Sequence, residues 1–199
     1  MIEVLALLPG LIIGVILHEM GHGYAALKFG DDTAKREGRL DWRQLHTHVD
    51  PIGTLVFPLV GLLAGGFIFG WARPVPIRPN RFSNYKTGML VVSLAGVAAN
   101  FALALVSALF LNVFDTGLMA LILIKSVQIN CILGVFNLLP IPPLDGSKVI
   151  ATLFPSTERF FYESEQYGMF IIIGLIFIGA FKYLLIPALL LTQLFLSLA

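Results

Sequence analysis

The chain of 199 residues is 57% hydrophobic and only 13% charged, with a formal net charge of +1. A soluble domain carries about a quarter charged residues, so these values exclude an ordinary water-soluble protein and predict one that lies in a lipid bilayer. The small net charge argues neither for nor against nucleic acid, and we expect no nucleic-acid partner.

The first apolar run, Ile2–Leu17, predicts a transmembrane helix that continues to about Phe29. It has no basic n-region and no small-residue cleavage site before the first histidine, so we expect it to be retained rather than removed as a signal peptide. Gly10 and Gly14 lie about one turn apart on this helix and predict close packing against a neighbour.

The pentapeptide His18-Glu19-Met20-Gly21-His22 stands near the end of this run. Residues i and i+4 share a helix face, so His18 and His22 can both point ring nitrogens at one ion, with Glu19 beside it. Zinc hydrolases use this H-E-x-x-H arrangement, with two ligands and a general base on one turn. A chance pentapeptide is the alternative. An ionisable residue inside a membrane costs about 2.5 kcal/mol or more, which favours the functional interpretation.

Residues 30–50 are rich in charge, and Glu37-Gly38 predicts a turn with short strands or surface loop on either side. His46 and His48 lie in this segment, close to Asp50. Their i,i+2 spacing favours surface roles, or contacts behind the metal ligands, over a second metal site.

Ile52–Trp71 is apolar enough to be a membrane span, but it is a poor helix because it contains the helix-disfavouring residues Pro58, Gly61, Gly65, Gly66 and Gly70. A re-entrant hairpin fits as well as a helix, with Thr54–Val60 folding back on Phe67–Trp71. An extended segment follows from residue 71 to 79, and the basic stretch to which it belongs ends near Lys86.

Met89–Asn112 and Leu118–Leu139 predict two further spans. Asn100 lies within the first of them. It can hydrogen-bond to a neighbouring helix or approach the metal site, and helix packing is the favoured interpretation. Cys131, the only cysteine, excludes an intrachain disulfide and is interpreted as a buried small apolar residue.

The stretch Asn137–Gly146 contains three prolines, which remove backbone donors and forbid a regular helix at or near membrane depth. Such backbone is tolerated where it lines a cavity. Asp145 is the only carboxylate between Asp115 and Glu158, which makes it the natural third ligand beside the two histidines. The alternative is that Asn137 and Asp145 are turn and cap residues of a loop.

The C-terminal residues 167–199 are too long for one untilted span and predict either one span plus a surface helix or two short spans. The whole chain is therefore predicted to be an all-α polytopic membrane protein with about five to six membrane segments. We expect a small β or re-entrant hairpin near the cytoplasmic side, and we expect residues 1–199 to form one membrane-embedded domain.

Three motifs occur in an order that resembles the site-2 protease family of intramembrane zinc metalloproteases, in its minimal branch without a PDZ or CBS domain. They are the histidine pentapeptide, Gly96-Val-Ala-Ala-Asn100 and Asn137-Leu-Leu-Pro-Ile-Pro-Pro-Leu-Asp-Gly146. The resemblance implies that His18, His22 and Asp145 bind one Zn²⁺ and that Glu19 is catalytic. It also implies that Asn137 holds the substrate backbone. Ala98 departs from the family pattern, in which a proline is frequent.

The expected function is hydrolysis of peptide bonds within or near transmembrane segments of membrane-protein substrates whose helices can unwind. The excess of Lys and Arg on one side predicts a multi-pass protein of the cell membrane with its active site toward the cytoplasmic half. The main alternative is a metal-ion transporter or pore that uses the same three ligands. It gives Glu19 no necessary role, and the chain lacks the two related halves that are typical of transporters. A catalytically silent membrane chaperone is disfavoured because Glu19 and all three ligands are present.

Overall fold

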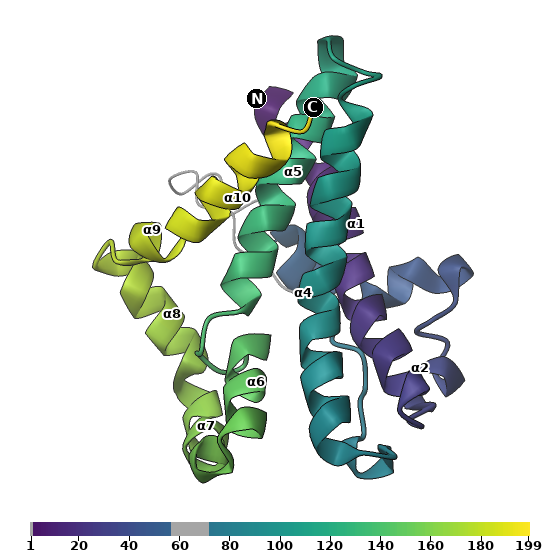
Figure 1. Cartoon of the computed structure of the whole chain (residues 1–199), viewed down its shortest axis with the longest axis vertical. Helices are drawn as coiled ribbons and strands as arrows, with labels where there is room; N and C mark the ends of the chain where they lie inside the picture. Colours follow the sequence, from purple (N-terminus) through teal and green to yellow (C-terminus); the bar gives the residue numbers. More distant parts are fainter. Residues whose placement is uncertain (1, 57–71) are drawn as a thin grey trace.

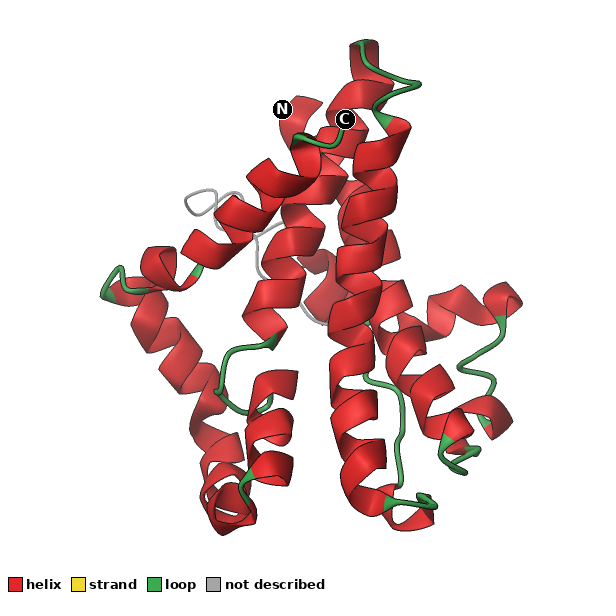
Figure 2. Cartoon of the chain, in the orientation of Figure 1, coloured by secondary structure: helices red, strands yellow, loops and turns green. Residues whose placement is uncertain are grey.

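A computed structural model describes residues 2–56 and 72–199 (Figure 1). Within these ranges every regular element is helical and no strand is present, which confirms the all-α class (Figure 2). Among the described residues, three helices are long and apolar enough to cross a membrane: α1 (Ile2–Lys28), α4 (Tyr85–Phe110) and α5 (Gly117–Asn137). The expected total of about five to six segments is not confirmed in this part of the chain.

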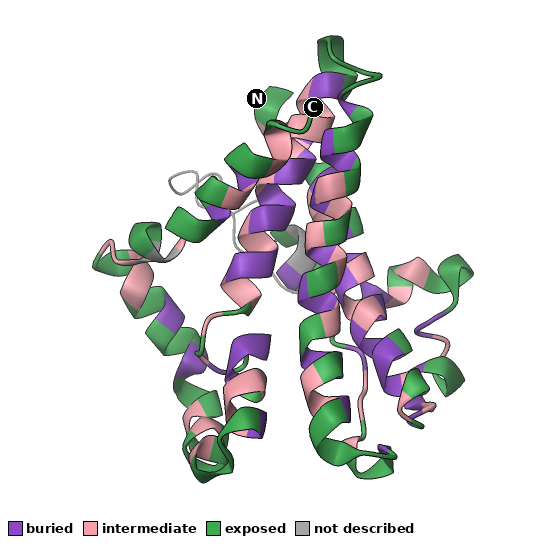
Figure 3. Cartoon of the chain, in the orientation of Figure 1, coloured by how far each residue is buried: buried purple, intermediate pink, exposed green. Residues whose placement is uncertain are grey.

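Helices α1, α4 and α5 form the core, with α4 antiparallel to the other two (Figure 1). Their buried residues face one another, and exposed residues lie on the outer faces (Figure 3). A Cβ atom at Gly10 would lie 2.6 Å from the Cα atom of Ser126 on α5, and one at Gly14 would overlap the Asn130 side chain. The predicted close packing at both glycines is therefore confirmed. Cys131 is buried between α4, α5 and α10, as predicted.

The polar chain between α1 and α4 folds at one end of this core. The backbone N–H of Ser83 donates to the carbonyl oxygen of Phe29 at 2.8 Å, so the segment that leaves α1 meets the segment that enters α4. Asp31 is fully buried and accepts hydrogen bonds from Thr33 and from the backbone N–H of Arg78. The short helices of this region are α2 (Thr33–Arg36), η1 (Trp42–His48), η2 (Pro51–Val56) and η3 (Pro79–Arg81).

For residues 30–50, the prediction is partly wrong. Gly38 has a φ of +71°, so the expected turn is present, but its flanks form the short helices α2 and η1 where short strands or surface loop were expected. The side chain of Asp41 accepts a hydrogen bond from the backbone N–H of Arg43, which caps η1 and favours a helical start there. The first residues of the predicted hairpin, 54–56, belong to η2, and the rest of it, 57–71, lies outside the described residues.

The loop between α5 and α6 (Asp145–Leu153) has no regular structure, as its prolines predict. The C-terminal part then forms an arm of short helices that returns to the core where α10 packs on α5 (Figure 1). None of these helices is long enough to count as a span. They are η4 (Pro155–Thr157), α7 (Glu158–Ser164), η5 (Glu165–Tyr167), α8 (Gly168–Phe177), α9 (Phe181–Leu184) and α10 (Ile186–Leu196).

Candidate metal centre

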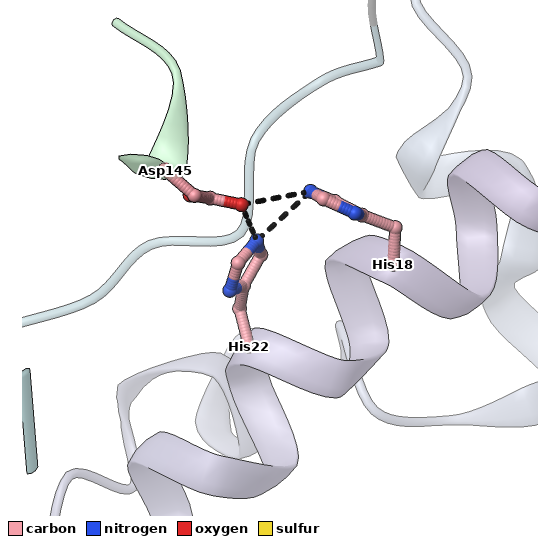
Figure 4. A group of neighbouring side chains, drawn as sticks. All are labelled: His18, His22 and Asp145. Carbon is pink, nitrogen blue, oxygen red and sulfur yellow. Dashed lines mark hydrogen bonds and ion pairs between the residues drawn. The ribbon is translucent and has the colours of Figure 1, made fainter. Parts of the chain in front are cut away.

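Three side chains from two distant elements converge inside the protein (Figure 4). His18 and His22 lie one turn apart on α1, and their Nε2 atoms are 3.0 Å from each other. Asp145 is the first residue of α6, and its Oδ2 atom lies 3.3 Å from His18 Nε2 and 3.1 Å from His22 Nε2. The exposed fractions of these residues are only 9%, 6% and 3%, in chain order.

The hydrogen bonds behind the two histidines fix which ring nitrogen carries a proton. His22 Nδ1 lies 2.7 Å from the carbonyl oxygen of Val92, which can only accept, so His22 donates from Nδ1. His18 Nδ1 lies 2.8 Å from Oδ1 of Asn100 and donates in the same way. In the neutral imidazoles both Nε2 atoms therefore present lone pairs toward the centre.

The three facing atoms fit a bound metal ion. Two imidazole lone pairs and a carboxylate oxygen repel one another at this range, and Asp145 Oδ2 has no hydrogen-bond donor. Ligands about 2.0–2.2 Å from a tetrahedral zinc lie about 3.3–3.6 Å apart, slightly farther than the 3.0–3.3 Å separations seen here. A divalent cation resolves the repulsion, and two His with one carboxylate is a ligand set that catalytic zinc uses.

Glu19 lies beside this centre. Its Oε2 atom accepts a hydrogen bond of 2.7 Å from the backbone N–H of Val75, in the extended segment that precedes η3. Glu19 and the three candidate ligands line one cavity of about 690 Å³. The carboxylate is therefore placed where it can exchange a proton with a small molecule in that cavity.

Asn137, the predicted substrate contact, lines the same cavity from the C-terminal end of α5. Its Nδ2 atom donates to the carbonyl oxygen of Leu133 at 2.9 Å. The structure thus brings Asn137 to the cavity of the three ligands and Glu19. Its expected contact with a substrate backbone stays a prediction.

Both interpretations of Asn100 hold, because its side chain contacts His18 and also hydrogen-bonds to α1 and α5. His46 is exposed, and the three-residue metal group contains neither His46 nor His48. His48 is buried and donates from Nε2 to the carbonyl oxygen of Arg39 at 2.8 Å. Burial lowers the pKa of His48, which keeps the ring neutral.

Three neighbours of the centre were missed by the sequence reasoning: Val75, Asn130 and Ser93. Asn130 is fully buried and donates to the carbonyl oxygen of Gly10, and the available signal was a polar amide within an apolar span. Ser93 has a buried hydroxyl without a hydrogen-bond partner among the described residues and lines the cavity. No signal in the sequence marks Val75, which acts through its backbone.

A buried H-E-x-x-H helix turn, completed by a distant aspartate within a bundle of membrane-length helices, defines a membrane-embedded metallopeptidase. The chain belongs to peptidase family M50, the site-2 protease family, whose model matches residues 112–181.

Among its relatives, the Bacillus subtilis protein YwhC, whose name describes a candidate zinc metalloprotease, is 38% identical over 93% of this chain and 88% of the relative. Rip2 of Mycolicibacterium smegmatis, named in the same way, is 31% identical over 85% of this chain and 65% of the relative. Zinc metalloprotease MJ0392 of Methanocaldococcus jannaschii is 24% identical over 79% of this chain and 34% of the relative. No solved structure gives a significant match. The predicted family is confirmed.

Proposed function

We propose that this protein, a zinc metalloprotease, hydrolyses peptide bonds within or near transmembrane segments at the centre formed by His18, His22 and Asp145, with one Zn²⁺ per chain. The observation that carries the proposal is the convergence of three potential ligand atoms, with Glu19 in the same cavity. Zinc bound there supplies a Lewis acid that polarises a carbonyl group and activates a water molecule. Residues 1–199 act as one membrane-embedded domain.

Glu19 acts as the general base and acid. Its carboxylate accepts a proton from the attacking water and returns it to the leaving amine. The Val75 N–H bond holds Oε2, which fixes the orientation of the carboxylate. A metal transporter or pore would give this carboxylate no task, so the placement of Glu19 supports hydrolysis over that alternative. Asn137 holds the substrate backbone at the other side of the cavity.

The substrate is a membrane protein whose helix unwinds before it is cut. A transmembrane helix engages its carbonyl groups in i to i−4 hydrogen bonds, so the reacting atoms reach one only after the helix opens. Opening it in lipid leaves backbone groups unsatisfied at a cost of several kcal/mol each. A neighbouring backbone edge that takes up these groups lowers the cost. We expect the predicted hairpin, Thr54–Val60 with Phe67–Trp71, to supply that edge, and its residues 57–71 lie outside the described residues.

The protein is a multi-pass protein of the cell membrane, with the active site toward the cytoplasmic half. The hydrogen bond between Ser83 and Phe29 supports this, because it brings the basic residues on both sides of the undescribed segment to one end of the core. The Lys and Arg residues near that end are Lys28, Lys35, Arg36, Arg39, Arg43, Arg73, Arg78, Arg81, Lys86, Lys148 and Arg159. Such an excess marks the cytoplasmic side.

Cysteine labelling tests this orientation. In a Cys131→Ala background, cysteines at the exposed positions Arg43 and Arg81 react with a membrane-impermeant reagent only from the cytoplasmic side. A cysteine at Val113, which is 70% exposed at the opposite end of the core, reacts only from outside. Labelling of Arg43→Cys and Arg81→Cys from opposite sides would contradict the proposal.

Co-expression with candidate single-span membrane proteins tests the activity. Wild type cleaves a substrate, and Glu19→Gln, which keeps the shape and loses the base, reduces cleavage by at least about 100-fold while zinc stays bound. Glu3→Gln on the same helix is the matched control and cleaves normally. A Gly in the substrate span speeds cleavage over a poly-Leu span. Unchanged cleavage by Glu19→Gln would overturn the proposal.

A further inference from the structure

Two fully buried asparagines lie between the three core helices, behind the metal centre. Asn100 belongs to α4 and Asn130 to α5, and neither has any exposed surface. A buried amide without partners is costly in an apolar interior, so its hydrogen bonds indicate what it is there to do.

Asn130 is anchored to backbone that can only accept hydrogen bonds. Its Nδ2 atom donates to the carbonyl oxygen of Gly10 at 3.1 Å and to that of Ser126 at 3.0 Å. Both of its N–H groups are thereby used, and the amide cannot be flipped without facing oxygen toward oxygen. Its Oδ1 atom is left to accept from a neighbour.

The side chain of Asn100 is also oriented by the acceptors that its donors face. Its Nδ2 atom donates to Oδ1 of Asn130 at 3.0 Å and to the carbonyl oxygen of Gly14 at 3.1 Å. With both donors used, Oδ1 of Asn100 faces Nδ1 of His18. The chain of hydrogen bonds therefore runs in one direction, from His18 through the two amides to carbonyl oxygens of α1 and α5.

We propose that Asn100 and Asn130, which we call the asparagine relay, are positioning residues that hold His18 as a zinc ligand. The relay requires the Nδ1 proton of His18, and so leaves the lone pair on Nε2, directed toward His22 and Asp145. This inference rests on the proposed function, since it assigns the relay to the same metal centre. His22 needs no such relay because a backbone carbonyl, that of Val92, does the same work.

Helix packing alone does not require this arrangement. The same α4–α5 interface contains a second buried polar pair, in which the hydroxyl groups of Ser107 and Ser126 lie 2.8 Å apart. That pair joins the two helices and ends there. The relay uses both Nδ2 donors of each amide and connects carbonyl oxygens of α1 and α5 to His18, a proposed metal ligand. Loss of such an outer partner weakens metal binding by about 10–100-fold.

The test measures the zinc dissociation constant of the purified full chain by competition with a chromophoric chelator, together with stability against denaturant. We expect Asn100→Leu to bind zinc about 10–100-fold more weakly and Asn130→Leu to shift affinity in the same direction by less. Ser107→Ala, which also removes one buried interhelical bond, is the matched control and keeps the wild-type affinity.

Asn100→Asp separates positioning from packing. It retains an acceptor for His18 Nδ1 but loses both donors, so it should be no more stable than Asn100→Leu and yet bind zinc more tightly. The cobalt-substituted proteins provide a second readout. The visible bands of Asn100→Asp should resemble those of wild type more closely than those of Asn100→Leu do.

Zinc affinity that follows stability across all four variants, or equal affinity in Asn100→Leu and Ser107→Ala, would overturn the relay. If Asn100→Leu does not fold, Asn130→Leu and Asn100→Asp carry the same comparison. Failure of the wild-type chain to bind zinc is a different result. It would contradict the proposed function, and the relay with it.

Discussion

His18 and His22 reach the candidate metal centre from a long helix in the middle of the core, whereas Asp145 reaches it from the first turn of a short helix after an irregular loop. Behind the histidines lie buried groups, Oδ1 of Asn100 and the carbonyl oxygen of Val92. Behind Asp145 lies Lys148, whose side chain is 48% exposed, with Nζ 3.3 Å from Oδ1.

The buried partners of the histidines and the exposed partner of Asp145 indicate that the two sides contribute to zinc binding in different ways. On the histidine side, buried hydrogen bonds fix the orientation of the two rings, so small steric changes there should weaken zinc binding. On the aspartate side, the loop sets the position of Asp145 and its carboxylate supplies negative charge. Loss of Asp145 should therefore weaken zinc binding more than loss of its outer partner, Lys148. Three substitutions test this comparison, and we expect the change in zinc affinity to decrease from Asp145 to Gly96 to Lys148.

Asp145→Asn removes the only anionic ligand and should lower zinc affinity by more than the roughly 100-fold that the loss of an outer partner can cost, with cleavage falling accordingly. Metal analysis after chelator competition measures it. Asp115→Asn, an exposed carboxylate at the far end of the core, is the control and should behave as wild type. Retention of zinc with full activity in Asp145→Asn would assign the third ligand elsewhere.

Gly96→Ala tests the histidine side. Gly96 lies on α4 directly against both rings, and an added Cβ atom would lie 2.7 Å from Cε1 of His18 and overlap the His22 ring. Overpacking costs about 1–3 kcal/mol, which corresponds to roughly 5–150-fold in zinc affinity if it acts on the ligands. Gly174→Ala on α8 is the control, because no described atom lies within 4 Å of its added Cβ. Equal zinc affinity in the two variants would show that the rings are not tightly held.

Lys148→Met should have the smallest effect. Partly exposed ion pairs contribute about 0–1 kcal/mol, so zinc affinity should change by less than about fivefold. Isothermal titration with zinc resolves such a change. A loss as large as that of Asp145→Asn would mean that Lys148 holds the carboxylate in place, and the contrast between the two sides would disappear.

Local patterns in the sequence were sufficient to predict which three side chains converge in the structure. The i,i+4 spacing of His18 and His22 needs only a helix, and Asp145 was the one carboxylate available in its part of the chain. The membrane-length helices follow from apolar runs that are long enough to span a bilayer.

The contacts around the group depend on tertiary packing and could not be predicted in this way. Asn130 meets Gly10 across 120 residues of chain, and Val75 meets Glu19 across 56. Such pairs depend on the rotation and register of helices against one another, which no single sequence pattern specifies. The short strands or surface loop expected near residues 30–50 are replaced by short helices for a local reason, since the cap at Asp41 favours a helical turn there.

X-ray absorption spectroscopy of the zinc-loaded, purified chain tests the central claim most directly, because it reports the atoms bound to the metal. The account predicts one zinc per chain with two imidazole nitrogens, further light ligands that include a carboxylate oxygen, and no sulfur. Scattering from a sulfur ligand, which would bring in Cys131, or the absence of imidazole scattering would contradict it.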